Sequence, residues 1–267
     1  MNIEKDLTNQ VFGCQLLDAD SEKILDQAQI RLFQKWLRSK SLSVYYLGQE
    51  FVVHPKVFPP RPDSLVLAQS IDVGYGADVL DVGTGSGVLS VVAGIHLGWD
   101  KGQGAGSVVA TDVSPQAVAN ATMNMNKKFK QVAKKRFVAY ETNEVLPKQN
   151  QKFDVVMANL PLRHKPIDKF FSDKDKAMAM VRRTMWDQEF NAHQVLLTKG
   201  KEYLKADGYM LLTIANYSDA LRALELICRN GWRFTVTNRR EFYPCDDKHH
   251  YPIPLVVACL RLDPASI

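Results

Sequence analysis

The sequence predicts an α/β fold: a mostly parallel seven-stranded sheet with an antiparallel edge hairpin, preceded by a small N-terminal helical element. Three observations support this fold class. Short β-branched strands alternate with helical segments from residue 63 onward. The last two predicted strands have no helix between them, which is typical of an antiparallel pair. A separate amphipathic helix precedes a proline-rich stretch near the N-terminus.

The N-terminal part is predicted to begin with an amphipathic helix over 21–39. Its apolar side chains recur at helical spacing: Leu25, Ala28, Leu32 and Trp36. An extended stretch follows over 44–53, and prolines oppose a regular helix over 54–62. We therefore expect residues 1–62 to form a helical element and linker, and residues 63–267 to form the main domain.

The main domain is predicted from alternating strand and helix patterns. Strands are expected at 78–82, 107–111, 136–140, 153–158, 209–214, 232–238 and 255–262. Helices are expected at 64–71, 87–97, 115–129, 187–205 and 218–230. Proline is tolerated near the start of the helix that begins at Pro115, and Gly231 follows the last helix as a stop signal. Repeated strand–helix–strand units place helices on both faces of a parallel sheet.

Composition places the chain among ordinary globular proteins. The 267 residues are 46% hydrophobic and 24% charged, enough to bury a core without disulfides or metals. No apolar run reaches the roughly 18 residues that span a bilayer, so no membrane partner is expected. The four cysteines are scattered and the first residues are polar, which indicates a reduced, cytoplasmic protein. A net charge of +5 is compatible with an RNA partner but does not require one.

A glycine-rich loop follows the first strand of the main domain. In Asp81-Val-Gly-Thr-Gly-Ser-Gly87 the chain turns directly into a helix, whose N-terminus favours a negatively charged group. A dinucleotide site requires G-x-G-x-x-G, but Val88 stands at the third glycine position counted from Gly83. A P-loop is excluded because no Gly-Lys-Ser/Thr follows. The next strand ends in a second acid, Asp112.

This loop and acid resemble the first motif of class I S-adenosylmethionine-dependent methyltransferases, which implies their Rossmann-like fold and S-adenosyl-L-methionine as cofactor. In that family the loop wraps the methionine moiety and the second acid bonds both ribose hydroxyls. The resemblance implies that Val113 packs against the adenine and that Asn143 or Glu144 approaches its amino group. The full set of expected cofactor-binding residues is Asp81, Gly83, Thr84, Gly85, Gly87, Asp112, Val113, Asn143, Glu144 and Asn159.

The fourth strand ends in Asn159-Leu-Pro-Leu162, at the strand edge where ligands bind in open α/β sheets. This tetrapeptide resembles the (Asn/Asp)-Pro-Pro-(Tyr/Phe) signature of methyltransferases that modify planar nitrogens, and the Asn-Leu-Pro-Tyr of rRNA dimethyladenosine transferases. The resemblance implies catalytic roles for Asn159, Leu160 and Pro161: the Asn side-chain oxygen and the next carbonyl accept hydrogen bonds from the target NH₂. Pro161 restricts Leu160 to an extended conformation. Leu162 departs from the motif, because the family places an aromatic residue there to stack on the substrate.

A wider stretch is similar to the protein-(glutamine-N5) methyltransferases, which act on peptide-chain release factors and a ribosomal protein. It comprises Tyr46-Leu-Gly-Gln-Glu-Phe51, Val57-Phe-Pro-Pro-Arg-Pro-Asp-Ser64 and the glycine loop. The similarity implies a protein glutamine amide as methyl acceptor, with Arg61 and Leu162 at the substrate. Three alternatives stay open: an rRNA or tRNA base N-methyltransferase, a small-molecule enzyme of secondary metabolism that uses S-adenosylmethionine, and a non-catalytic cofactor-binding subunit.

Three further segments carry weaker expectations. Residues 163–186 are expected to select the substrate or cover it, with Lys165, Arg182 and Arg183 available to an acidic partner. The basic run over 127–136 is expected to be a solvated face directed away from the site. The run Cys245-Asp-Asp-Lys-His-His250 lacks zinc-like spacing, so no metal site is expected there.

Overall fold

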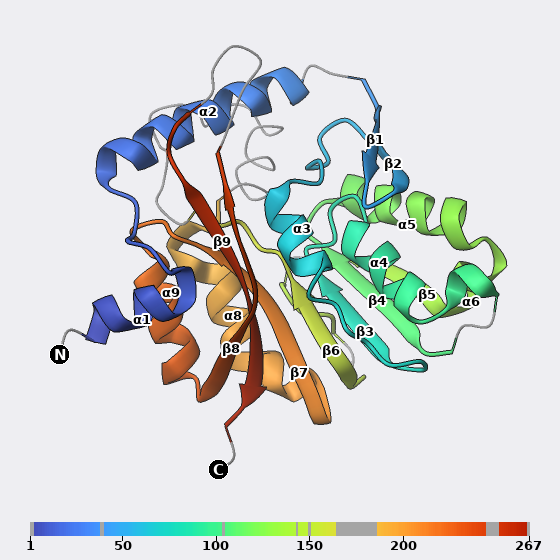
Figure 1. Ribbon diagram of the computed structural model, residues 1–267. Coiled ribbons are helices and arrows are strands. Elements are labelled where there is room, and N and C mark those ends of the chain that lie inside the picture. The colour runs from blue at the N-terminus through green and yellow to red at the C-terminus, as the bar shows by residue number, and fades with distance from the viewer. Residues whose placement is uncertain are drawn as a thin grey trace.

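The computed structural model describes residues 3–37, 40–102, 105–142, 144–148, 151–163, 186–243 and 251–265. Its main feature is a seven-stranded sheet of order β5-β4-β3-β6-β7-β9-β8 (Figure 1). The strands are β3 (Asp78–Val82), β4 (Ser107–Asp112), β5 (Phe137–Glu141), β6 (Phe153–Ala158), β7 (Leu204–Ala215), β8 (Trp232–Phe242) and β9 (Leu255–Pro264). Strands β3 to β7 are parallel, and β9 runs antiparallel between β7 and β8. The predicted fold class, with its antiparallel edge hairpin, is confirmed.

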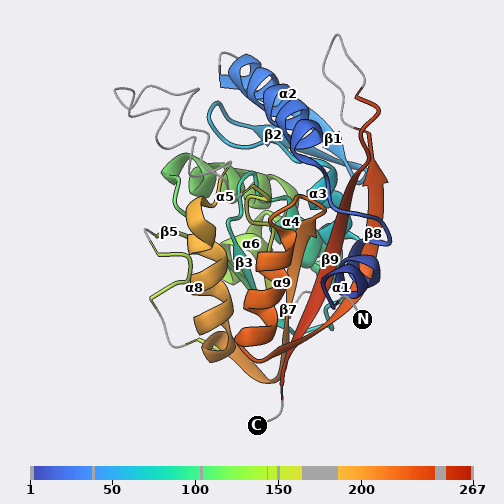
Figure 2. The ribbon, with the colours of Figure 1, turned by 90° about the vertical axis from the view of Figure 1, so that its left-hand side faces the viewer.

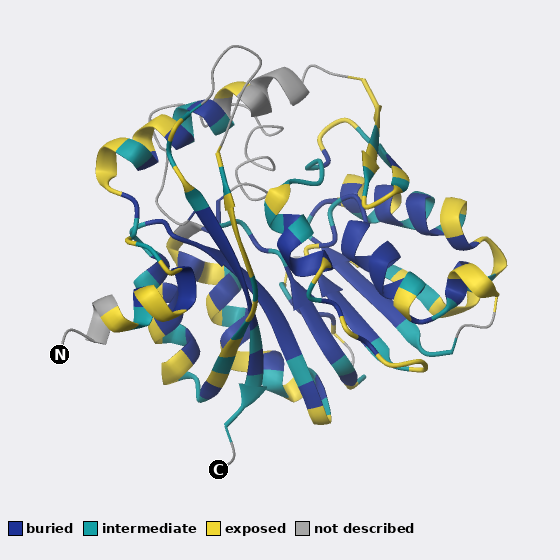
Figure 3. Cartoon of the chain, in the orientation of Figure 1, coloured by how far each residue is buried: buried dark blue, intermediate teal, exposed yellow. Residues whose placement is uncertain are grey.

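Helices cover both faces of the sheet, and the strands are buried between them (Figures 2 and 3). One face packs against α3 (Pro62–Ala68), α4 (Val88–His96) and α5 (Pro115–Phe129), followed by α6 (Gln131–Arg136). The other face packs against α8 (Asn191–Lys199) and α9 (Ala220–Arg229). Successive strand residues serve opposite cores: Val79 belongs to the first and Leu80 to the second. In the described part of the chain, no helix combines the length and apolarity needed to span a membrane.

The predicted helix over 187–205 is wrong in its extent. The chain forms the 3-10 turn η2 (Gln188–Phe190), then α8, then the 3-10 turn η3 (Gly200–Tyr203), and β7 already begins at Leu204. Positive φ angles of 56° at Glu189 and 61° at Phe190 interrupt the helix at its start. At the other end Leu204 pairs with Phe153, because β7 extends past the predicted strand to meet the start of β6.

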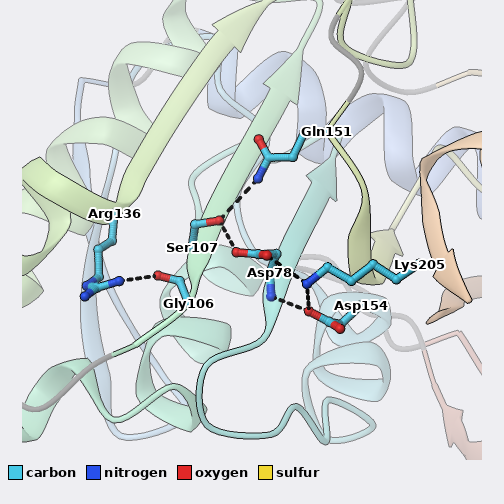
Figure 4. A network of polar contacts seen from close by, with 7 residues as sticks. All are labelled: Asp78, Gly106, Ser107, Arg136, Gln151, Asp154 and Lys205. Carbon is cyan, nitrogen blue, oxygen red and sulfur yellow. Dashed lines mark hydrogen bonds and ion pairs between the residues drawn. The ribbon is translucent and has the colours of Figure 1, made fainter. Parts of the chain in front are cut away.

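A polar network ties the amino ends of the central strands together (Figure 4). The Lys205 Nζ lies 2.8 Å from the Asp78 carboxylate and 2.8 Å from that of Asp154. The backbone N–H of Asp78 donates to Asp154 over 2.7 Å, and the Ser107 hydroxyl donates to Asp78 over 2.6 Å. The amino ends of strands β3, β4, β6 and β7 are therefore fixed relative to one another.

The N-terminal residues pack on the same cores. They form α1 (Ile3–Phe12) and α2 (Ala19–Leu37), and α2 lies beyond the carboxyl ends of the central strands in Figure 1. Leu17 and Leu25 of this region are buried in the first core, and Val11 and Phe12 are buried in the second. The backbone N–H of Leu17 also donates to the carbonyl of Asn216 over 2.8 Å. The division at residue 62 stays a prediction.

The stretch predicted as extended over 44–53 is a β-hairpin of β1 (Leu42–Tyr46) and β2 (Gln49–Val53). Its two-residue turn has φ angles of 51° at Leu47 and 70° at Gly48, a combination that suits the twist of a tight hairpin. After the hairpin, the proline segment ends in α3, because Pro62 occupies a first-turn position that needs no N–H donor.

Two buried asparagines of α5 attach the hairpin to the main domain. The Asn120 side chain accepts from the N–H of His54 over 2.8 Å and donates to the carbonyl of Val52 over 2.7 Å. Asn124 accepts from the N–H of Val52 over 3.0 Å and donates to the carbonyl of Ser86 over 2.8 Å. These hydrogen bonds thus fix the positions of the end of β2, α5 and the glycine loop relative to one another.

We expect the Asn120→Ala variant to lose about 1–3 kcal/mol of stability, because the N–H of His54 loses its partner and the carbonyl of Val52 keeps only its bond from Asn124. Thermal unfolding followed by circular dichroism measures this as a lower Tm. Asn126→Ala, a less buried position on the same helix, is the matched control and should change stability by less than about 0.5 kcal/mol. Equal Tm values for the two variants would contradict the claim that the Asn120 hydrogen bonds hold the hairpin on the main domain.

Candidate active site

The glycine loop connects β3 to α4 and is folded tightly against its neighbours. The N–H groups of Gly83 and Thr84 donate to the carbonyl of Thr111 over 2.8 and 3.0 Å. At Gly87 φ is 83°, and an added Cβ would stand 2.8 Å from the Cα of Ala121 in α5. Only glycine fits this position, which lets the N-terminus of α4 lie close to α5.

Asp81 lies beneath the loop and is fully buried. One carboxylate oxygen accepts from the Thr84 hydroxyl over 2.8 Å and from the Ser90 hydroxyl over 2.6 Å. The other oxygen makes no hydrogen bond within the described residues. Burial raises the pKa of Asp81 to about 6, against the opposing effect of the two hydroxyls. The side chain therefore shapes the loop from below and does not line the cavity above it.

Asp112 holds the loop from the end of the neighbouring strand β4. One oxygen accepts from the N–H of Gly85 over 2.9 Å, and the other accepts from the N–H of Ser114 over 2.9 Å. Burial raises the pKa of this carboxyl, and the backbone donors partly counter the rise. Each carboxylate oxygen keeps acceptor capacity for a further hydrogen bond. Asp112 borders the cavity, so a ligand hydroxyl can reach it.

A cleft opens above the loop at the carboxyl ends of β3, β4 and β6. The space in and in front of it, open solvent included, is about 1000 Å³. The predicted residues that line it are Gly83, Thr84, Gly85, Asp112, Val113, Glu144, Asn159, Leu160 and Pro161. Asn143 lies outside the described residues, as do Lys165, Arg182, Arg183 and the run over 245–250. Most of the predicted residues therefore line one cleft at the carboxyl ends of the strands, where such sheets bind ligands.

One wall of the cleft was not predicted from the sequence. It is formed by residues 56–60, the segment between β2 and α3. The Asn120 and Asn124 hydrogen bonds to the end of β2 position this wall. The prolines correctly predicted irregular backbone here. The same sequence pattern is expected for a simple linker and for a segment that lines a ligand site, so the sequence did not distinguish the two.

Three predicted residues besides Asp81 lie off the cleft surface. Gly87 packs behind the loop against α5. Arg61 precedes α3, and its carbonyl accepts from the Tyr46 hydroxyl over 2.8 Å. Leu162 packs on the first core and borders a small separate cavity with His193 and Thr213.

Asn159 is held at the end of β6 with its amide orientation fixed. Its NH₂ donates to the Asp63 carboxylate over 2.7 Å and to the Ser64 hydroxyl over 3.1 Å, both in α3. Its oxygen accepts from the Thr213 hydroxyl of β7 over 2.5 Å. A carboxylate accepts hydrogen bonds and cannot donate them, so Asp63 selects this orientation over the flipped one. None of these partners is near Asn159 in the sequence.

Comparison with known proteins gives one family match and a set of structural matches. The family model for ribosomal protein L11 methyltransferase (PrmA) matches residues 65–180, which carry the glycine loop, Asp112 and Asn159. No curated protein matches the chain. The family match spans less than half of the 267 residues and includes every predicted cofactor position.

Three solved structures with the same fold are similar over most of this chain. A precorrin-6y C5,15-methyltransferase from Geobacter metallireducens GS-15 is 15% identical, covering 80% of this chain and 94% of that one, with a TM-score of 0.52. The tRNA m1G37 methyltransferase of M. jannaschii is 16% identical, covering 86% and 56%, with a TM-score of 0.53. NSun6 from Pyrococcus horikoshii, solved with SFG, is 15% identical, covering 79% and 53%, with a TM-score of 0.53.

These structures share the fold, and the family match adds the sequence of the cofactor-binding half. The family match, together with a cleft bordered by the glycine loop and Asp112, identifies S-adenosylmethionine as the cofactor. The chain is an S-adenosylmethionine-dependent methyltransferase with the fold of these structures, and its residues 65–180 are similar to the ribosomal protein L11 methyltransferases.

Proposed function

We propose that this enzyme methylates a planar nitrogen of a protein substrate, with a glutamine side-chain amide as the first acceptor to test. The observation that carries the proposal is Asn159, whose amide borders the cleft at the end of β6 in a fixed orientation. The adjacent Leu160 and Pro161 border the same cleft, so the strand end presents the three residues together.

The cofactor would be held by residues around the glycine loop. Gly83, Thr84 and Gly85 would surround its methionine end, and Asp112 would accept the ribose hydroxyls. Val113 and Glu144 would line the adenine end. S-adenosylmethionine supplies a methyl group on a sulfonium, whose departure needs no general acid. Gly87 and Asp81 would act indirectly, by keeping the loop in shape.

An amide nitrogen is a poor nucleophile because its lone pair is delocalised into the carbonyl. Two acceptors directed at its N–H groups hold it in place and favour a tetrahedral nitrogen, which is preorganisation and not covalent catalysis. The Asn159 oxygen, which retains a lone pair beside its bond to Thr213, and the Leu160 carbonyl would be these acceptors. The proton would leave to water after transfer. Phe58 is an aromatic residue in the wall of the cleft, whereas Leu162 lies outside the cleft.

The protein acceptor is supported by the family match, because the matched family is described as methyltransferases of a ribosomal protein. The similarity of residues 46–64 to protein-(glutamine-N5) methyltransferases points to the same class of substrate. A release-factor-like or ribosomal protein is therefore the preferred partner, and Arg61 beside α3 would stand at the substrate entrance.

We expect Asn159→Ala to lower methyl transfer by about 10²–10³-fold, since an acceptor aligned with the reacting nitrogen is removed. The measurement is transfer from methyl-tritiated S-adenosylmethionine into a cell extract, with protein, RNA and small-molecule fractions counted separately. Binding of S-adenosylhomocysteine to the variant should stay within a few-fold of wild type. Full turnover in Asn159→Ala would refute the role of this side chain.

A base of RNA is the second candidate acceptor, and a basic surface on α5 and α6, outside the lining of the cleft, favours the binding of RNA. We define the α5–α6 basic surface as six exposed cations: Lys127, Lys128, Lys130, Lys134, Lys135 and Arg136. No acidic residue occurs between positions 113 and 140. Glu50 of the hairpin pairs with Lys127 and neutralises one of the charges. Tyr140, 40% exposed, stands on the neighbouring edge strand β5. Exposed cations beside an aromatic side chain are typical of RNA-binding surfaces.

If RNA is the acceptor, Lys134→Glu/Lys135→Glu should weaken binding to bulk ribosomal RNA at least about tenfold at low salt. Filter binding over a salt series measures this, and each lost phosphate contact lowers the slope of log K against log salt by about 0.9. Lys199→Glu/Arg229→Glu, on the opposite face of the sheet, is the matched control and should bind as wild type. No RNA retention by wild type at low salt, with tritium only in the protein fraction, would eliminate this candidate.

A further inference from the structure

Arg163, the residue directly after the Asn159–Leu162 tetrapeptide, is buried although it carries a charge. Only 3% of its surface is exposed. Its Nε and Nη2 donate to the two carboxylate oxygens of Asp26 in α2, over 2.8 and 2.7 Å. Its Nη1 lies 3.4 Å from the carboxylate of Glu22, also in α2. The guanidinium thus forms a two-pronged ion pair with a helix 137 residues earlier in the chain.

The same cluster reaches the turn after β7. The Arg163 guanidinium carbon lies 4.5 Å from the centre of the Tyr217 ring. Glu22 accepts from the N–H of Ser218 over 2.5 Å with its other oxygen. The helix α2 also donates to the Tyr217 hydroxyl through Gln29, over 3.3 Å. The buried Arg163 guanidinium and the buried Glu22 carboxylate therefore connect α2, the segment after β6 and the turn after β7.

The backbone of Arg163 connects to a fourth element at the cleft. Its carbonyl accepts from the N–H of Asp187 over 2.9 Å. Asp187 in turn accepts from the N–H groups of Ala192 and His193 over 2.7 and 2.9 Å, at the start of α8. Ala192 borders the cleft. The side chain of Arg163 thus contacts α2 and the turn after β7, and its main chain connects to the start of α8 beside the cleft.

A buried ion pair of this kind contributes little net stability, because desolvation of the charges offsets their attraction. It does fix geometry: the planar guanidinium matches a carboxylate along two parallel hydrogen bonds, which a lysine cannot reproduce. The orientation of the chain at position 163 is therefore tied to α2. The turn that carries Asn159 and Leu160 lies three to four residues away.

We infer that Arg163 is a positioning residue, through which α2 sets the placement of the turn that bears Asn159. The inference rests on the proposed role of Asn159 in orienting the acceptor nitrogen. In this arrangement α2 is part of the catalytic unit and not an appendage to it. Loss of the two-pronged contact would displace the acceptor-binding groups while leaving the glycine loop and Asp112 in place.

The test compares Arg163→Lys and Asp26→Asn with Lys205→Met as matched control. Arg163→Lys keeps the charge and removes the fork, and Asp26→Asn keeps the side-chain shape and removes the charge. Lys205→Met breaks the polar network at the opposite ends of the same strands, so it reports simple loss of a structural contact. Three quantities are measured: binding of S-adenosylhomocysteine, kcat and KM for tritium transfer into total ribosomal protein, and amide hydrogen exchange over residues 19–37 and 158–163.

We expect both cluster variants to lower kcat about 10- to 100-fold, with S-adenosylhomocysteine affinity and the KM for S-adenosylmethionine within about twofold of wild type. Amide exchange should accelerate in 19–37 and 158–163 together. Lys205→Met should alter neither kcat nor exchange in these segments. Unchanged kcat in both cluster variants would overturn the inference, as would faster exchange in 19–37 alone or loss of S-adenosylhomocysteine binding.

The result separates this inference from the proposed function. Full turnover in Asn159→Ala with low turnover in Arg163→Lys would reject the Asn159 role and leave the coupling to α2 in place. Low turnover in Asn159→Ala with full turnover in both cluster variants would reject the coupling alone. The exchange measurement needs no acceptor, so it tests the coupling whichever substrate the enzyme uses.

Discussion

The cofactor end of the cleft depends on two buried carboxylates that hold the glycine loop from opposite sides. Asp81 binds it from below through the hydroxyls of Thr84 and Ser90, and Asp112 binds it from the next strand through the N–H of Gly85. Burial raises the pKa of both carboxyls. Asp81 does not line the cleft and acts only on the shape of the loop, whereas Asp112 borders the cleft and keeps acceptor capacity for a ligand hydroxyl.

The acceptor end of the cleft depends on residues from the N-terminal part of the chain. Residues 56–60 form one wall, and two buried asparagines of α5 fix the strand before it. The other side is tied to α2 through Arg163 and Asp26. In the proposed function, strand ends of the parallel sheet would hold the cofactor, and elements outside the sheet would shape the space for the substrate.

The sequence predicted the features that depend on local patterns. All seven strands were found because period-two and continuous apolar runs mark them, and the glycine spacing identified the loop. Features that depend on distant partners were not predictable. Arg163 was predicted to begin a segment that selects or covers the substrate, and nothing near it in sequence reveals its partner Asp26. Asn159 takes its orientation from Asp63 and Thr213, which are also distant in sequence. The short helix α1 was not among the predicted elements, and Leu162 packs on the core and borders a separate cavity.

The most direct test of the cofactor site is calorimetric titration of S-adenosylhomocysteine into the wild-type protein and Asp112→Ala. The account predicts one site per chain in wild type and an affinity about 10- to 100-fold lower in the variant, which loses charge-assisted bonds to the ribose and to the loop. Asp100→Ala, an exposed carboxylate on the turn after α4, is the control and should bind as wild type. The absence of binding to wild type, or equal affinity in Asp112→Ala, would contradict the central claim that this loop and acid hold the cofactor.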